Sequence, residues 1–156
     1  MRLHICAIGR IRTGPERALI ADYLTRFDRT GRSLSLGPCT EHEIDDRKAT
    51  TPAAQATLLQ RALPEGAHIV ALDERGEMRA SPDLARMMAS LRDGGTADLA
   101  FVIGGADGLD EGFRAQAQSL LSFGPMVWPH ALARVMLSEQ IYRAATILAG
   151  GPYHRA

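Results

Sequence analysis

A glycine-rich turn, Gly104-Gly105 with Gly108, is the first of four stretches in the last third of the chain whose residue types can do chemistry. It follows directly after an apolar run, and glycines let the backbone approach a ligand closely. The spacing matches neither the GxGxxG pattern of dinucleotide-binding turns nor a P-loop. The turn therefore favours a backbone cradle for a neutral or zwitterionic ligand, and a plain glycine turn after a strand is the equal alternative.

The second stretch runs from Ser122 to His130 and contains Gly124, two prolines and Trp128. This composition predicts a rigid, non-helical loop. Its backbone N–H and C=O groups could meet the edge of an adenine. In the simpler alternatives, Trp128 is a core residue and His130 caps the helix that follows.

The third and fourth stretches are a helix pair and the tail. Glu139 and Arg143 are four residues apart, so they can pair on one face of a helix. An ordinary surface ion pair would contribute little. Behind a stiff Gly-Pro, Tyr153, His154 and Arg155 could stack on a base, titrate near neutrality and hold a phosphate. A frayed terminus is the alternative.

Length and composition indicate one domain over residues 1–156, of which 46% are hydrophobic. No apolar run approaches the roughly 20 residues that span a bilayer. Met1–Gly9 lacks a signal-peptide cleavage site, so we expect a cytoplasmic protein. Cys6 and Cys39 lie far apart, and no histidine has ligand spacing. We therefore expect two unpaired thiols and no metal site.

Charge is distributed unevenly along this neutral chain. Residues 1–32 hold seven arginines against three acids, a net charge of +4. Residues 33–113 have a net charge of −7, from seven basic and fourteen acidic side chains. Residues 114–156 have a net charge of +3, from four arginines and one glutamate. If the two basic ends meet in the fold, the protein can present a cationic face to phosphates.

Alternating apolar runs and helical stripes predict the elements that must position these residues. The expected strands are Leu3–Ile8, Leu34–Leu36, His68–Leu72, Leu99–Ile103 and a short one ending at Met126–Pro129. The expected helices cover about 16–27, 52–63, 81–91, 111–121 and 130–148, with caps at Thr51 and Ser81. Glu41–Lys48 is expected to be a mobile acidic loop. The alternation predicts an α/β domain with a mainly parallel sheet and helices on both faces.

The four stretches IGGADGL, SFGPMVWPH, RVMLSEQIYRA and terminal PYHR occur together in this order. In them the chain resembles the ribosomal large subunit pseudouridine methyltransferase H family, a group of minimal SPOUT methyltransferases. The N-terminal half is similar more loosely, through IGRIR, DYLTRF and ALDERGE. The resemblance covers essentially the whole chain, and its C-terminal block is specific.

This resemblance implies a C-terminal trefoil knot, a homodimer, and bent S-adenosyl-L-methionine bound in the knot. The implied reaction is methyl transfer to N3 of a pseudouridine, the position-1915 site of 23S rRNA, in the assembled ribosome. Chains are rarely threaded, so periodicity alone does not predict the knot. The residues implied for the cofactor are Leu72, Gly105, Gly124, Pro125, Met126, Val127, Trp128 and Pro129.

For the base, we hypothesise that one helix arginine and the tail bind and polarise the pseudouridine. These residues are Arg143, Tyr153, His154 and Arg155, with Glu139 orienting Arg143. The ring must lose the proton on N3, and a nearby cation favours its anionic form. In a dimer, the tail of one subunit could complete the pocket of the other.

The chain departs from the family pattern at Ala106-Asp107, at the large Trp128 and in its neutral charge. The charge suggests dependence on the whole ribosome as substrate. Three other readings compete. A SPOUT methyltransferase for tRNA usually needs an added RNA-binding domain, for which 156 residues leave no room. A non-catalytic ribosome-binding protein would have a dead cofactor pocket, and an oxidoreductase is disfavoured by the missing GxGxxG.

Overall fold

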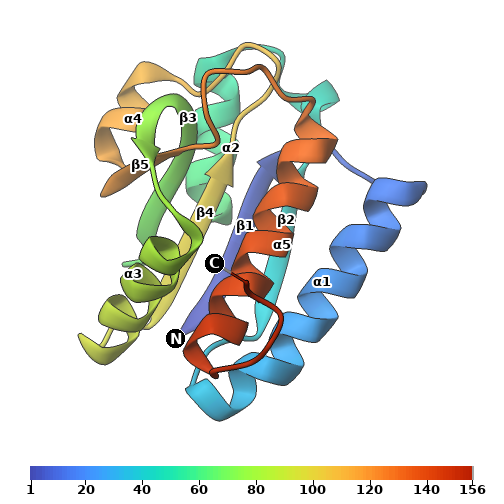
Figure 1. Ribbon diagram of the computed structural model, residues 1–156. Coiled ribbons are helices and arrows are strands. Elements are labelled where there is room, and N and C mark those ends of the chain that lie inside the picture. Colours follow the sequence, from blue (N-terminus) through green and yellow to red (C-terminus); the bar gives the residue numbers. More distant parts are fainter. Residues whose placement is uncertain (156) are drawn as a thin grey trace.

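The computed structural model describes residues 1–155 as one five-stranded sheet with helices on both faces (Figure 1). Every pair of neighbouring strands is parallel, in the order β2-β1-β4-β3-β5. The strands are β1 (Arg2–Ile8), β2 (Cys39–Ile44), β3 (His68–Met78), β4 (Asp98–Ile103) and β5 (Ser119–Ser122). The helices are α1 (Pro15–Gly31), α2 (Pro52–Ala62), α3 (Ser81–Asp93), α4 (Glu111–Gln116) and α5 (His130–Leu148), with short 3-10 helices η1 (Arg32–Leu34) and η2 (Asp46–Lys48). The predicted fold class is confirmed.

Side chains alternate along the strands and fill two cores, one on each face of the sheet. Leu3 and Ile5 of β1 belong to the larger core, which α1, α3 and α5 cover. Cys6 and Ile8 belong to the smaller core under α2 and α4. The two basic ends of the chain do meet, because α1 packs along α5 (Figure 1).

Three loops lie at one edge of the sheet, where the parallel strands end. They are residues 9–14 after β1, 104–110 after β4 and 123–129 after β5. Ala7 of β1 and Leu72 of β3 both pair with Ile103, the last residue of β4, and Leu121 of β5 pairs with Leu72, so these strands are level at this edge. Ligands of open α/β sheets usually bind at this carboxyl edge.

The end of β3 forms an arch around the end of β5. Leu121 of β5 pairs with Leu72 on one arm of the arch and with Glu77 on the other. The expected strand His68–Leu72 therefore continues past an irregularity at residues 73–76 and ends at Met78. A Cβ at Gly76 would lie 2.7 Å from the backbone of Leu121, so only glycine allows this approach. A chain held inside such an arch is what the predicted C-terminal trefoil knot requires locally.

The second predicted strand and the acidic loop were both placed wrongly. Residues 32–34 form η1, and the edge strand β2 spans Cys39–Ile44, overlapping the first part of the stretch expected to be mobile. The pattern missed β2 because its sequence, CTEHEI, alternates polar residues instead of apolar ones. Glu41 and Glu43 are accommodated there because arginines from other elements pair with them.

The segment before α5 also differs from the prediction. Helix α4 ends at Gln116, and β5 occupies Ser119–Ser122, overlapping the end of the expected helix. No strand forms at residues 126–129, where the Val127 side chain is 89% exposed. A four-residue strand is too short to show a period, and the pairing with β3 decides it. The α3 cap differs as well, since Ala80 is the N-cap and Ser81 donates to Gln140 Oε1 at 2.7 Å.

Within residues 1–155, no helix is both long and apolar enough to cross a membrane. In the same range, the His, Cys, Asp and Glu side chains form no cluster of three or more that could bind a metal ion. Cys6 and Cys39 are free thiols, and Cys6 is buried.

Candidate functional site

Glu139 is the acceptor at the centre of a polar cluster on α5. Arg143 donates to Glu139 Oε1 through Nε at 2.9 Å and through Nη2 at 2.6 Å. The Tyr153 hydroxyl donates to the same oxygen at 3.0 Å. Both charged side chains are largely shielded, at 24% and 17% exposure for Arg143 and Glu139. This is therefore more than the solvated surface ion pair that spacing alone allows.

The tail folds back along α5 and does not fray. Its turn is held by the N–H of Gly151, which donates to the Thr146 carbonyl at 2.9 Å. The Tyr153 ring packs on Tyr142 with centroids 4.7 Å apart. The Arg143 guanidinium lies 4.7 Å from the Tyr153 ring centroid, at cation–π distance.

The two remaining tail residues differ from each other in position. His154 Nδ1 lies 3.4 Å from Arg143 Nη1, so the imidazole borders the cluster. Arg155 is exposed to solvent and is not part of it. The structure thus brings together Glu139, Arg143, Tyr153 and His154 and leaves Arg155 at the rim.

Burial and hydrogen bonding set the protonation of two members of this cluster, Tyr153 and Arg143. Burial raises the pKa of the Tyr153 hydroxyl, and its hydrogen bond to the Glu139 carboxylate raises it further. The hydrogen bond to Glu139 also raises the pKa of Arg143, although burial opposes this. Tyr153 therefore remains a neutral donor, and Arg143 remains a cation whose position is set by Glu139.

Gly105 lies at the carboxyl edge of the sheet and is buried. It accepts a hydrogen bond from the N–H of Gly108 at 2.9 Å, which closes the glycine turn. A Cβ at Gly105 would lie 2.7 Å from Gln55 Oε1 of α2. Gln55 is itself held by the Ala49 carbonyl at 3.1 Å. Sequence reasoning missed Gln55, because a glutamine on a helix carries no signal of its contact with a turn fifty residues later.

The loop of residues 123–129 offers unused backbone groups. Gly124 has a φ of +100° and open space around its Cβ position. Within residues 1–155, the N–H groups of Met126, Val127 and Trp128 donate no hydrogen bond. The Trp128 side chain is 40% exposed, so it is not a core residue. The N-cap of α5 is Pro129, and no side chain caps this helix.

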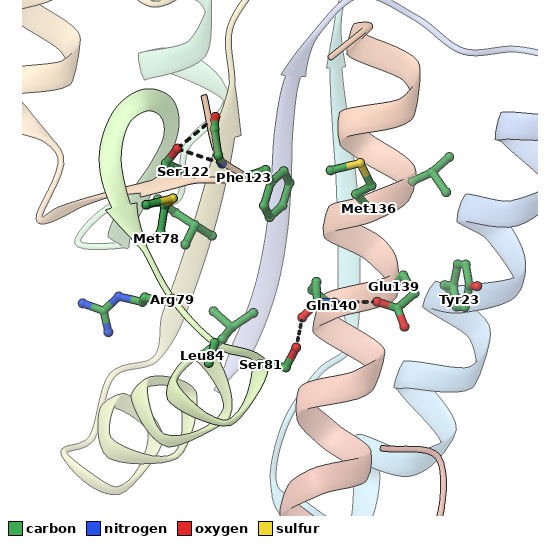
Figure 2. A pocket seen from close by; sticks show the side chains of 14 residues that line it. Tyr23, Met78, Arg79, Ser81, Leu84, Ser122, Phe123, Met136, Glu139 and Gln140 are labelled. Carbon is green, nitrogen blue, oxygen red and sulfur yellow. Dashed lines mark hydrogen bonds between the residues drawn. The ribbon is translucent and has the colours of Figure 1, made fainter. Parts of the chain in front are cut away.

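A groove of about 560 Å³ joins this loop to the polar cluster (Figure 2). Figure 2 shows Phe123 on one side and Met136 and Glu139 of α5 on the other. Gly124 lies at the loop end of the groove, and Tyr23 of α1 lines it near Glu139. The lining is mainly apolar, with a few polar groups, as is usual for binding grooves.

Within one chain, the residues expected to bind the cofactor lie far from the residues expected to bind the base. His130 and Arg143 are thirteen residues apart on α5, which corresponds to roughly 20 Å along the helix axis. Leu72, Gly105 and the loop before α5 lie at the carboxyl edge. The Arg143 cluster therefore lies well along α5 from that edge.

The sequence matches the family described as predicted SPOUT methyltransferases over residues 1–154. It is 63% identical over 155 residues to the ribosomal RNA large subunit methyltransferase H of Dinoroseobacter shibae, covering 99% of each chain. The corresponding protein of Ruegeria pomeroyi is 62% identical over the same length and coverage. The chain belongs to the SPOUT methyltransferases, and within them to the methyltransferase H family.

Among solved structures, this SPOUT family member is similar to the SpoU methyltransferase AviRb from Streptomyces viridochromogenes, in complex with AdoMet. The sequence identity is 15% and the TM-score is 0.46. The match covers 96% of this chain and 59% of that chain.

Proposed function

We propose that this protein transfers a methyl group from S-adenosyl-L-methionine to N3 of a pseudouridine in 23S rRNA of the assembled ribosome. The observation that carries the proposal is the cluster in which Tyr153 and Arg143 share one oxygen of Glu139. The names of relatives that are 63% and 62% identical support ribosomal RNA of the large subunit as the substrate. An enzyme that acts on ribosomes would work in the cytoplasm.

The residues at the carboxyl edge fit the cofactor. Leu72, level with the last residue of β4, and Gly105, just after that strand, would flank it, and the loop from Gly124 to Pro129 would bind the adenine edge. The three unused N–H groups of that loop suit hydrogen-bond acceptors on an adenine. When bound, the cofactor supplies an electrophilic methyl group on a sulfonium.

The polar cluster suits the other half of the reaction. Pseudouridine N3 must lose its proton before or as the new N–C bond forms. Arg143 places a fixed positive charge beside the ring and favours its anionic form. Tyr153 donates only, and its ring offers a stacking surface. Methyl transfer from a sulfonium then needs alignment more than acid–base help.

We also infer a homodimer in which each site takes its tail from the other subunit. The roughly 20 Å along α5 between His130 and Arg143 supports this arrangement. Large apolar side chains are exposed next to the groove and loop, including Met78 at 70% and Met126 at 70%. Exposed apolar residues of this kind mark interaction surfaces. A second copy that covers them would also bring its own Arg143 cluster.

The decisive experiment compares methylation of assembled ribosomes, free large subunits and naked 23S rRNA, and maps the modified nucleotide by mass spectrometry. We expect one added methyl group on N3 of a single pseudouridine, most rapidly in assembled ribosomes. Methylation at another atom, or of tRNA, would overturn the assignment. Calorimetry with S-adenosyl-L-methionine tests the non-catalytic alternative, which requires no binding at millimolar ligand.

A further inference from the structure

Arg134 is a fully buried cation outside the proposed active site. Its side chain is 2% exposed, in the first part of α5. Nη1 lies 2.5 Å from Glu43 Oε2, and Nη2 donates to the Gly9 carbonyl at 2.8 Å. Burying a charge is costly unless it is paired and hydrogen-bonded. The burial of Arg134 with these two partners therefore indicates a specific structural or functional role.

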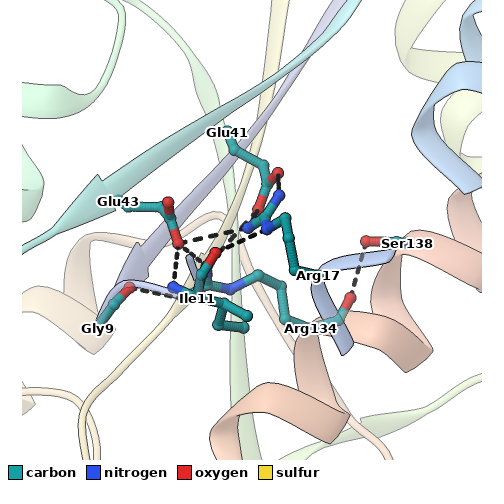
Figure 3. A network of polar contacts seen from close by, with 7 residues as sticks. All are labelled: Gly9, Ile11, Arg17, Glu41, Glu43, Arg134 and Ser138. Carbon is teal, nitrogen blue, oxygen red and sulfur yellow. Dashed lines mark hydrogen bonds and ion pairs between the residues drawn. The ribbon is translucent and has the colours of Figure 1, made fainter. Parts of the chain in front are cut away.

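Side chains from β2, α1 and α5 hydrogen-bond to the backbone of the loop of residues 9–14 (Figure 3). Glu43 of β2 accepts the N–H of Ile11 at 2.7 Å, and Arg17 of α1 donates to the Ile11 carbonyl at 2.7 Å. Arg17 also pairs with Glu41 at 2.6 Å. Burial raises the pKa of Glu43, but the Ile11 N–H and Arg134 outweigh it and the net pKa is lowered. Glu43 therefore stays ionised at neutral pH, and the network holds the backbone between β1 and α1.

The loop that is held carries two exposed arginines, which line a shallow pocket together with Asp45, Asp46 and Arg47. Arg10 and Arg12 flank Ile11 in sequence, and both are exposed. Within residues 1–155, neither makes an ion pair, whereas both arginines of the network, Arg17 and Arg134, do. The side chain of Ile11 packs against the core. The backbone is therefore anchored while the two guanidinium groups face solvent.

The same loop lies on the edge assigned to the cofactor. β1 and β4 are neighbours, and Ala7 pairs with Ile103, so residues 9–14 and the glycine turn leave the sheet side by side. Arg134 also follows the loop of residues 123–129 by one helical turn. Arg134 and Glu43 thus connect the loop of residues 9–14, called the arginine loop below, to the start of α5, the helix that carries Glu139 and Arg143.

We propose that Arg10 and Arg12 contact phosphates of the RNA substrate and that Arg134, through Glu43 and Gly9, is a positioning residue that holds their loop in place. The inference rests on the proposed function and names a surface for the RNA beyond the cluster. Guanidinium groups suit phosphates in charge and geometry. An anchored loop loses little conformational entropy when RNA binds. This surface also lets a chain without net charge bind a polyanion.

The first test is the double variant Arg10→Ala/Arg12→Ala, assayed on assembled ribosomes over a series of KCl concentrations. We expect KM for ribosomes to rise about tenfold or more. The slope of log KM against log salt concentration should fall by about one to two, which corresponds to the loss of one to two phosphate contacts. kcat and the Kd for S-adenosyl-L-methionine should not change. The matched control is Arg29→Ala/Arg32→Ala, which removes the same charge from exposed positions at the opposite end of α1.

The second test concerns positioning. Arg134→Met should raise KM in the same way while leaving Arg10 and Arg12 in place, and the triple variant should be no worse than the arginine-loop double variant. Arg134→Lys should restore part of the effect. If Arg134→Met does not fold, Glu43→Gln replaces it, with amide exchange at Ile11 as a readout that must accelerate.

An unchanged KM and salt slope in Arg10→Ala/Arg12→Ala would overturn the phosphate surface while the wild-type enzyme still methylates ribosomes. Loss of kcat or cofactor binding in Arg134→Met, with KM unchanged, would overturn the positioning assignment. If the wild-type protein itself does not methylate ribosomes, the proposed function fails and not this inference alone.

Discussion

The hydroxyl of Tyr153 donates to Glu139 Oε1 at 3.0 Å, and this contact ties the end of the chain to the middle of α5. The same oxygen receives both donors of Arg143. A terminal segment is normally mobile. Here the tail is ordered because its one aromatic hydroxyl and its imidazole meet a pair of charges already set on the helix. The relationship makes Glu139 the residue on which the geometry of the cluster depends.

Glu139→Gln should therefore impair catalysis without affecting cofactor binding. The amide keeps the shape but removes the charge that orients Arg143. Hydrogen bonds to charged groups contribute about 1.5–3 kcal/mol, so kcat should fall roughly tenfold to a hundredfold. Single-turnover methylation and calorimetry measure the two quantities.

The matched control for this variant is Asp22→Asn. Asp22 and Arg26 form another pair with the same spacing, on the exposed surface of α1. Its loss should change neither rate nor affinity, because exposed pairs contribute little. Equal rates for wild type and Glu139→Gln would show that the cluster is not part of the reaction.

Gly105→Ala tests the cofactor edge. The new methyl would lie 2.7 Å from Gln55 Oε1, so the flexible end of Gln55 must move. We expect the protein to fold and the affinity for S-adenosyl-L-methionine to fall about tenfold, a change of about 1.4 kcal/mol. Gly105→Ala/Gln55→Ala should recover much of the affinity, since the displaced amide is gone.

The control for the glycine experiment is Gly112→Ala, at an exposed position in α4. Its affinity for S-adenosyl-L-methionine should equal that of the wild type. A double variant no tighter than Gly105→Ala would mean that the displaced Gln55 is not the cause.

Mixed dimers test whether the tail acts in trans. Arg143→Ala disables the base cluster and Gly105→Val disables the cofactor edge, so each variant alone should be inactive. Co-expressed with two affinity tags, half of the dimers should be mixed, and each mixed dimer should hold one intact site. We expect about a quarter of the wild-type rate from the statistical mixture. A mixture as inactive as its components would place the tail in its own subunit's site.

Acidification should destabilise the fold through His42 and His68, which lie outside the candidate site. Burial lowers the pKa of His42, whose Nε2 lies 3.0 Å from His4 Nδ1, and His4 lowers it further. Burial also lowers the pKa of His68. The folded state thus binds these protons less readily than the unfolded chain. The contribution of these two histidines to the free energy of unfolding is therefore fully present above their unfolded pKa of about 6.5. It is lost as the pH falls through that value towards their lower pKa values in the folded state.

Urea unfolding between pH 7.5 and pH 5 measures this loss. His42→Asn and His68→Asn should each flatten the dependence of unfolding free energy on pH, and the effects should add because the side chains are in different parts of the fold. An unchanged slope in the double variant would assign the pH dependence to other groups.

Local sequence determined the apolar strands and the long helix. β1, β4 and α5 were predicted within a residue, because a continuous apolar run or a helical stripe carries its own signal. The order and spacing of four motifs were enough to indicate the family. The Glu139–Arg143 pair was also local, since four residues on one helix are neighbours in any fold.

Tertiary structure decided what depends on partners distant in sequence. The acidic strand β2 exists because Arg134, ninety-one residues after Glu43, pairs with it inside the fold. β5 forms because β3 arches around it, and Gln55 meets Gly105 only once α2 packs on the sheet. The tail is ordered by Glu139 and not by its own composition. The position of a charged residue or a short strand depends on a partner that is distant in sequence. An apolar residue pattern with a helical or strand period, in contrast, indicates its element and its buried face locally.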